Sequence, residues 1–166
     1  MQNSNKRIAI VPGSFDPITY GHIDIVQRAA EEYDHVYLAV MINREKSYMF
    51  TIEQRKRIAL AAVAKLPNVE VISSEGMLWE LAKELQACTI VKGYRNEVDL
   101  TYEERMADYN RSFYPEAQTI LLPSDPNLLQ VSSTLVRDHI LHHRDLTPYM
   151  PQEAIDEIYR ILPRTI

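Results

Sequence analysis

Two short segments, one near each end of the chain, carry residue types that bind phosphate groups. The first spans residues 12–22 and joins a glycine turn to the start of a helix, with His22 in the first helical turn. The N–H groups and the positive end of a helix attract anions, and a histidine beside them can donate a hydrogen bond to a phosphoryl oxygen. The second opens another helix with Ser132, Ser133 and Thr134, and Arg137 adds a planar donor one turn later.

Each segment also has an ordinary structural interpretation. His22 alone could be a surface histidine near a helix cap, and Arg137 an exposed arginine behind a plain N-cap. The first segment is neither a Walker loop nor a dinucleotide fingerprint, since G-x-x-x-x-G-K and G-x-G-x-x-G are both absent. Their joint occurrence on either side of one domain favours ligand binding.

Glycines are scarce, and three of the 4 stand where strands end or a helix begins. Gly13 and Gly93 directly follow predicted strands, and Gly21 opens the first helix. Each could be an ordinary turn glycine. Together they predict bare backbone at one end of a sheet, for a positive φ or for the close approach of a ligand.

Short apolar runs alternate with stretches of helical periodicity. The runs are rich in Val and Ile, which predicts strands buried on both faces, as in a parallel sheet; they cover residues 8–11, 35–42, 69–72, 89–92 and 119–122. Helices are predicted between them, for example over 78–85, and Thr51 with Gln54 predicts a capping box that opens the helix ending at Lys65. Pro151 suits the first turn of a last helix. We expect a single α/β domain over residues 1–166: a Rossmann-like, doubly wound, five-stranded parallel sheet with helices on both faces.

Composition excludes several classes of protein. The chain has 166 residues and a net charge of −5, with no basic run, which argues against nucleic-acid and membrane-surface partners. Its longest apolar runs, 36–42 and 58–64, are too short to span a membrane, and its polar start lacks a signal-peptide core. The one cysteine, Cys88, excludes an intrachain disulfide and a multi-cysteine zinc site, and is predicted to be a buried, inert thiol. We expect a soluble, cytoplasmic protein.

Three histidines near the end of the chain invite comparison with a metal site. His139, His142 and His143 lie on or after a predicted helix, and no carboxylate partner is implied by their spacing. A solvated helix end is the favoured interpretation.

These motifs resemble the nucleotidyltransferase superfamily with the T/H-x-G-H signature, which includes class I aminoacyl-tRNA synthetase cores. Within it, the chain is similar to bacterial phosphopantetheine adenylyltransferases over nearly its whole length. The matching segments are 12–19 with 21–26, Lys46 with 49–51, 92–95, Tyr102-Glu103 with Asn110-Arg111, and 131–134. Thr19, where many superfamily members carry histidine, favours this family over nicotinamide mononucleotide adenylyltransferases and cytidylyltransferases.

The resemblance implies transfer of AMP from ATP to 4′-phosphopantetheine, giving dephospho-coenzyme A and pyrophosphate, the penultimate step of coenzyme A synthesis. It implies Mg²⁺ as cofactor, held mainly through ATP phosphates, and a homohexamer. His22 would stabilise the transition state. By motif position, the implied ATP contacts are Ser14, Phe15, His22, Gly93, Tyr94, Arg95, Glu103, Leu128, Leu129, Gln130, Val131, Ser132, Ser133 and Thr134. The implied 4′-phosphopantetheine contacts are Ser14, Lys46, Leu78 and Lys92.

A phosphate monoester is already a nucleophile, so the predicted chemistry needs no serine or cysteine nucleophile. The protein must hold the acceptor phosphate in line with the α-phosphate and neutralise charge as it spreads. Suitable donors are His22, Lys46, Lys92, Arg95 and Arg137. No carboxylate cluster has metal-ligand spacing, which fits Mg²⁺ delivered by ATP.

The chain departs from the family pattern at two places. Lys92 stands where the family usually has arginine, so a bidentate phosphate contact becomes a point charge. Residues 127–130 lack the tryptophan that some relatives place there. Two further hypotheses stay open: another adenylyl- or cytidylyltransferase of the superfamily, and a non-catalytic nucleotide sensor. A tRNA synthetase is disfavoured, since there is no K-M-S-K-S motif and no room for an anticodon domain.

Overall fold

All five predicted strands are present in the computed structural model, which describes residues 6–163. They pair in parallel in the order β3-β2-β1-β4-β5, which confirms the predicted α/β fold. The strands are β1 (Ile8–Gly13), β2 (His35–Met41), β3 (Val69–Ser74), β4 (Thr89–Tyr94) and β5 (Gln118–Pro123). Each lies within two residues of its predicted bounds.

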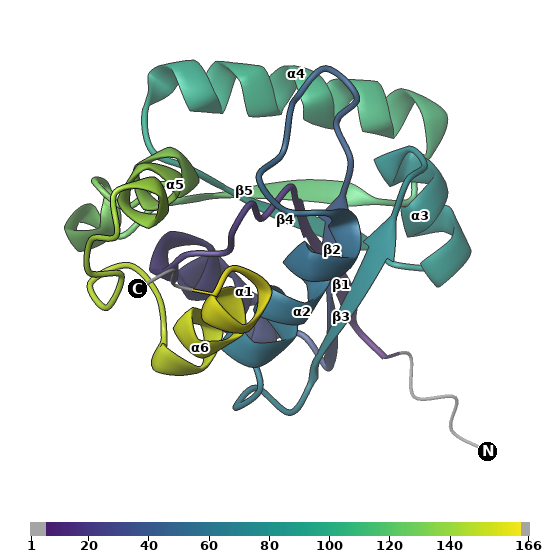
Figure 1. The fold of residues 1–166 in the computed structure, drawn as a ribbon. Coiled ribbons are helices and arrows are strands. Elements are labelled where there is room, and N and C mark those ends of the chain that lie inside the picture. The colour runs from purple at the N-terminus through teal and green to yellow at the C-terminus, as the bar shows by residue number, and fades with distance from the viewer. Residues whose placement is uncertain (1–5, 164–166) are drawn as a thin grey trace.

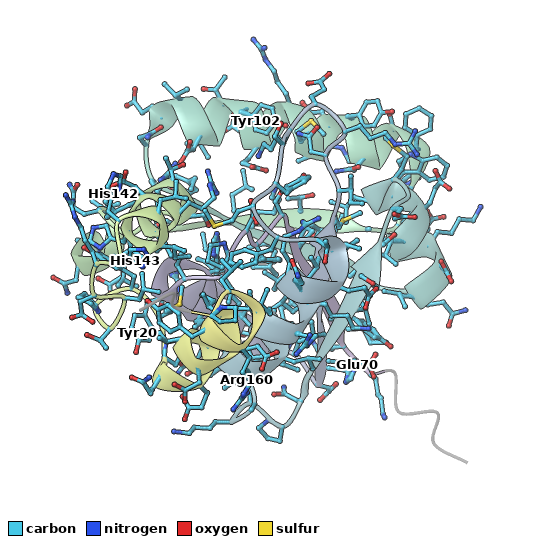
Figure 2. All side chains as sticks on the ribbon, in the orientation of Figure 1. Tyr20, Glu70, Tyr102, His142, His143 and Arg160 are labelled. Carbon is cyan, nitrogen blue, oxygen red and sulfur yellow. The ribbon has the colours of Figure 1, made fainter. Side chains whose placement is uncertain are left out.

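Helices cover both faces of this sheet (Figure 1). They are α1 (Tyr20–Glu32), α2 (Ile52–Ala62), α3 (Leu78–Leu85), α4 (Glu97–Phe113), α5 (Ser133–Leu141) and α6 (Gln152–Ile161), with a 3₁₀ turn η1 (Pro126–Leu128). One face packs against α1 and α2, with α6 lying against α2, and the other packs against α3 and α4. Figure 2 shows Tyr102 on α4 and Arg160 on α6 on opposite sides of the sheet.

Local sequence explains where several helices begin. Thr51 and Gln54 form the predicted capping box: the Thr51 hydroxyl accepts the Gln54 N–H at 3.1 Å, and the Gln54 side chain accepts the Thr51 N–H at 3.0 Å. The Asn96 side chain caps α4 by accepting the Asp99 N–H at 2.9 Å. Pro151 is the N-cap of α6 rather than a residue of its first turn, since its ψ of 153° is extended.

Two predictions of burial were wrong. The edge strand β5 has no fully buried residue, because it has a neighbour on one side only and helix cover on one face. Cys88 is exposed, since it stands one residue before β4 rather than inside it, and its thiol lies 3.7 Å from the Ile8 carbonyl oxygen. No helix within residues 6–163 is long and apolar enough to cross a membrane.

Candidate active site

The direction in which successive strands are added to the sheet reverses between β1 and β4. The chain runs outward from β1 through β2 to β3 and then returns to place β4 on the other side of β1. Doubly wound sheets bind their ligands at such a switch point. Ser14 and His22 follow β1, and Arg95 follows β4, so residues predicted from the sequence lie near this switch point.

His22 is fixed by the cap of its own helix. Thr19 is the N-cap of α1, and its backbone N–H donates to His22 Nδ1 at 3.0 Å. Because Nδ1 accepts this bond, we assign the proton of the neutral ring to Nε2. The Phe15 ring meets the imidazole edge-to-face, with ring centroids 5.0 Å apart, and restricts its rotation. His22 can therefore present one N–H donor in a set direction.

His22 is uncharged at neutral pH. Burial, and secondly the positive charge of Arg95, lower the pKa of His22 from 6.5 to about 4. Because β1 and β4 pair in parallel, the segments after them start at the same edge of the sheet. The site thus offers His22 as a neutral donor beside a cation.

The absent Cβ atoms of Gly13 and Gly93 leave room for neighbouring side chains, and the expected positive φ was wrong. No glycine among the described residues has a positive φ. A Cβ on Gly13 would lie 2.9 Å from the Phe15 ring, and a Cβ on Gly93 would lie 2.9 Å from an Ile25 side-chain carbon. The unusual backbone is instead at Phe15, whose φ is 48°. Its side chain is buried, so only the Phe15 backbone remains for a ligand.

Asp16 ties three segments of the site together. Its carboxylate accepts the N–H groups of Met49 at 2.9 Å and Phe50 at 3.0 Å, which fixes the end of the β2–α2 loop. Its carbonyl oxygen accepts a bond of 2.8 Å from the Arg137 guanidinium on α5. Asp16 is only 3% exposed, so these bonds satisfy a polar group that is costly to bury.

The hydroxyl groups at the start of α5 are already engaged within the protein. Ser132 caps α5 by accepting the Leu135 N–H, Ser133 donates to the Pro17 carbonyl oxygen at 2.8 Å, and Thr134 accepts from Arg137 at 3.1 Å. Ser132 and Thr134 only accept in these bonds, so their O–H groups and the free backbone N–H groups of the first turn are left to donate to an anion. Arg137, predicted as a phosphate donor, makes its bonds to Asp16 and Thr134.

A cavity of about 90 Å³ lies between β4, α3 and α4. It is lined by Met77, Leu78, Ile90, Lys92, Tyr102, Glu103, Met106, Ala107, Asn110 and Thr119. The Lys92 ammonium lies 2.8 Å from Glu103 Oε2, and the two side chains are 25% and 12% exposed. The cavity therefore combines apolar walls with a half-buried ion pair.

Comparison with known proteins identifies the family. A family model described as cytidylyltransferase-like matches residues 10–139. The phosphopantetheine adenylyltransferase of Streptococcus gordonii is 43% identical over 157 residues, which cover 94% of this chain and 96% of that protein. The enzyme of the same name from Photorhabdus laumondii is 42% identical over 147 residues, covering 89% and 92%. The chain belongs to the phosphopantetheine adenylyltransferase family.

A solved structure supports the fold independently of close sequence similarity. A putative nicotinate-nucleotide adenylyltransferase from Vibrio parahaemolyticus superimposes with a TM-score of 0.74 over 93% of both chains, at 18% identity. At that identity the likeness extends to the fold alone.

In this phosphopantetheine adenylyltransferase family member, the predicted site residues fall into three places. Leu78, Lys92 and Glu103 meet in the cavity, where Glu103 adjoins residues assigned to the acceptor although the resemblance groups it with ATP. Gly93 and Tyr94 end β4 beside Arg95. Residues 128–131 lead from η1 to α5, and the Val131 carbonyl oxygen lies 3.7 Å from the Cβ position of Gly21, at the start of α1.

Lys46 stands apart from the cavity residues. It lies in an exposed turn of the β2–α2 loop, and its side chain forms no hydrogen bond or ion pair with residues 6–163. A second cavity, of about 430 Å³, lies by α6 and is lined by none of the predicted site residues.

Sequence reasoning assigned no role to three polar residues of the site. Asp16 is described above, and Arg55 is 1% exposed on the inner face of α2. Asn110, 6% exposed on α4, lines the cavity, and its side-chain amide has no hydrogen-bond partner among the described residues. The signal for Arg55 was its helical spacing with Ile58 and Ala59, which places a charged residue on an apolar stripe.

Proposed function

We infer that this chain transfers AMP from ATP to 4′-phosphopantetheine, releasing pyrophosphate and forming dephospho-coenzyme A in the penultimate step of coenzyme A synthesis. Relatives that match it over more than nine-tenths of their length are named for this activity. The structural observation that supports it best is His22, a neutral and oriented donor at the switch point of the sheet.

The reaction is an in-line displacement between two phosphates. An oxygen of the acceptor phosphate attacks the α-phosphorus of ATP, a new P–O–P bond forms, and the bond to the β-phosphate oxygen breaks as pyrophosphate leaves. Negative charge spreads over the α-phosphate oxygens on the way, and the protein must stabilise it. We assign that role to the Nε2–H of His22, with Arg95 supplying positive charge from the other side of the crevice.

The cavity suits the acceptor. Its apolar wall at Leu78 can receive the aliphatic part of the pantetheine arm, and the unpaired amide of Asn110 can bond to one of that arm's amide groups. Lys92, which lines the cavity from within β4, would meet the acceptor phosphate, and Lys46 and Ser14 would approach that phosphate from the loops after β2 and β1.

ATP then occupies the crevice outside the cavity. We propose that its phosphates meet backbone groups at the starts of α1 and α5, where free N–H groups favour anions. The contacts we propose are Ser14, the Phe15 backbone, His22, Gly93, Tyr94, Arg95, Glu103 and residues 128–134. Glu103, ion-paired with Lys92, would then stand between the two substrates.

Mg²⁺ fits this site as a companion of ATP. Among residues 6–163 no group of three or more His, Cys, Asp or Glu side chains could hold a metal ion. Mg²⁺ commonly keeps several waters and binds through substrate phosphates, so we propose that ATP oxygens and water hold it. When bound, it would neutralise phosphate charge.

We further propose a homohexamer that works in the cytoplasm, where ATP is available. Helix α4 carries several partly exposed large apolar side chains: Val98 at 79%, Tyr102 at 55%, Tyr109 at 42% and Phe113 at 51%. A run of this kind along one helix favours burial against another subunit.

The test is pyrophosphate release from MgATP and, separately, MgCTP with a panel of phosphorylated acceptors. We expect release with ATP and 4′-phosphopantetheine, and none with either alone. A clear preference for CTP or for another acceptor would replace the assignment with another nucleotidyltransferase. Nucleotide binding with no turnover on any acceptor would favour a sensor. His22→Ala, purified in parallel, controls for contaminating activity.

A further inference from the structure

Tyr48 closes the β2–α2 loop that carries Lys46. Its hydroxyl accepts the Asn43 N–H at 2.7 Å and donates to the Asn43 carbonyl oxygen at 3.2 Å. One phenol thus binds both polar groups of a residue five positions earlier, which draws the two ends of the loop together.

The same carbonyl oxygen holds Lys46. The Lys46 N–H donates to Asn43 O at 3.0 Å, and the Glu45 N–H donates to Asn43 Oδ1 at 3.0 Å, which makes a tight turn over residues 43–46. Two hydrogen bonds therefore connect the Tyr48 hydroxyl to the backbone of Lys46. The Lys46 side chain has no protein partner within residues 6–163, so its place depends on this backbone.

The Arg55 guanidinium packs against one face of the Tyr48 ring. Its guanidinium carbon lies 4.0 Å from the ring centroid, and its Nη1 donates to the carbonyl oxygens of Ser14 at 2.7 Å and Met41 at 2.9 Å. Those carbonyls stand just beyond β1 and at the end of β2. Arg55 is 1% exposed, so Tyr48 rests on a fixed group.

Tyr48 also reaches the loop after β1. Its hydroxyl lies 3.3 Å from Ser14 Oγ. The single phenolic proton is given to Asn43 O, so the Ser14 hydroxyl is the donor in this contact. The loop of Lys46 and the loop of Ser14 therefore meet at one oxygen atom.

We propose that Tyr48 is a positioning residue that sets the place of Lys46 through the backbone of Asn43 and couples the Lys46 loop to Ser14. The consequence for catalysis depends on the proposed function, in which Lys46 meets the acceptor phosphate. Tyr48 touches neither substrate and acts through the residues it holds.

The first test measures the loop itself. Tyr48→Phe keeps the ring on Arg55 and removes the hydroxyl. We expect amide hydrogen exchange at Asn43 and Lys46 to become at least about tenfold faster, since the loss of a net hydrogen bond of roughly 1.5 kcal/mol corresponds to that factor. The matched control is Tyr33→Phe, because Tyr33 also stacks on an arginine, Arg7, at 4.8 Å but lies at the end of α1. Exchange at Asn43 and Lys46 should not change there, and unchanged exchange in Tyr48→Phe would overturn the proposal.

The second test measures the consequence for the acceptor. We expect Tyr48→Phe to raise KM for 4′-phosphopantetheine about tenfold and to change KM for ATP less than about twofold, because a displaced ammonium loses most of a charge-assisted bond. In a Lys46→Ala background the same substitution should change acceptor kcat/KM less than about twofold, since the residue that it positions is gone.

The outcomes distinguish failure of the Tyr48 proposal from failure of the proposed function. An equal loss of acceptor kcat/KM in both backgrounds, or no loss in either, would mean that Tyr48 does not act through Lys46. A general loss of structure would instead raise both Michaelis constants and lower the melting temperature. If the unaltered protein forms no pyrophosphate with 4′-phosphopantetheine, the proposed function fails, and hydrogen exchange alone still decides whether Tyr48 positions the loop.

Discussion

Replacing Lys92 by methionine should weaken the acceptor much more than ATP. Methionine is similar in length to lysine and carries no charge, so the substitution removes the ammonium and keeps most of the packing. Lys92 lies 2.8 Å from Glu103, whose side chain is 12% exposed. The substitution therefore has two effects: the acceptor phosphate loses a cation, and Glu103 loses its partner.

Each effect has a magnitude. A hydrogen bond to a charged group contributes about 1.5–3 kcal/mol, which corresponds to a ten- to hundredfold loss in acceptor kcat/KM. The unpaired carboxylate then repels the acceptor phosphate. Two unit charges about 8 Å apart at an effective dielectric constant of about 20 interact by about 2 kcal/mol, roughly a further thirtyfold. The single variant should lose about 300- to 3,000-fold, whereas Lys92→Met with Glu103→Gln should lose only about 10–100-fold.

The assay is initial-rate pyrophosphate release with each substrate varied in turn. We expect KM for ATP to change less than about threefold in both variants, and Lys92→Arg, which keeps the charge, to retain activity. Equal effects on both Michaelis constants would mean that the acceptor phosphate lies elsewhere. A double variant no better than the single would show that the charge of Glu103 does not reach the acceptor. Thermal melting of each variant checks that the half-buried site still folds.

Three further predictions concern His22 and assembly. His22→Ala should lower kcat about 10²–10³-fold with little change in ATP affinity measured by calorimetry, because the donor acts mainly in the transition state; an unchanged kcat would return His22 to a surface role. Below pH 6.5 the unfolded chain takes up a proton at His22, whereas the folded protein resists until about pH 4. The free energy of unfolding should therefore decrease as the pH falls from 6.5 to about 4, and this decrease should be smaller in His22→Gln. If urea unfolding showed the same pH dependence for the variant and the unaltered protein, the prediction would be wrong. Sedimentation at micromolar protein should show an assembly larger than a dimer, and a stable monomer near 19.3 kDa would refute the hexamer.

The sheet could be predicted because its signal is local. Runs of apolar β-branched residues at 8–11 and 35–42 gave strands within two residues of those observed, and the capping box at Thr51 marked the start of α2. Edge position is not a local property. Val69 begins a strand at one edge of the sheet and Gln118 begins one at the other, yet their sequences look like those of central strands, so burial was overestimated there.

The sequence correctly placed His22 in the first turn of a helix, whereas Lys92, predicted to end its strand, lies inside β4. Side-chain contacts between different elements of the site could not be predicted from the sequence. Lys92 and Glu103 are eleven positions apart on different elements, and nothing in their spacing implies an ion pair. A positive φ was expected at Gly13, but the glycine instead leaves room for the Phe15 side chain, a contact that only the folded chain reveals.

In the proposed reaction, the neutral state of His22 would let the site bind two polyanions and still favour the transition state. A charged histidine would attract any phosphate in the ground state, and its Nδ1–H would oppose the Thr19 N–H that now fixes the ring. As a neutral donor, His22 would add little to ground-state binding. Its hydrogen bond would strengthen when negative charge develops on the α-phosphate oxygens in the transition state. In this proposal the phosphates are attracted by Lys46, Lys92 and Arg95, on three other segments. Burial, and secondly Arg95, lowers the pKa of His22 and keeps it uncharged. Charge neutralisation and transition-state stabilisation are thus carried by different residues.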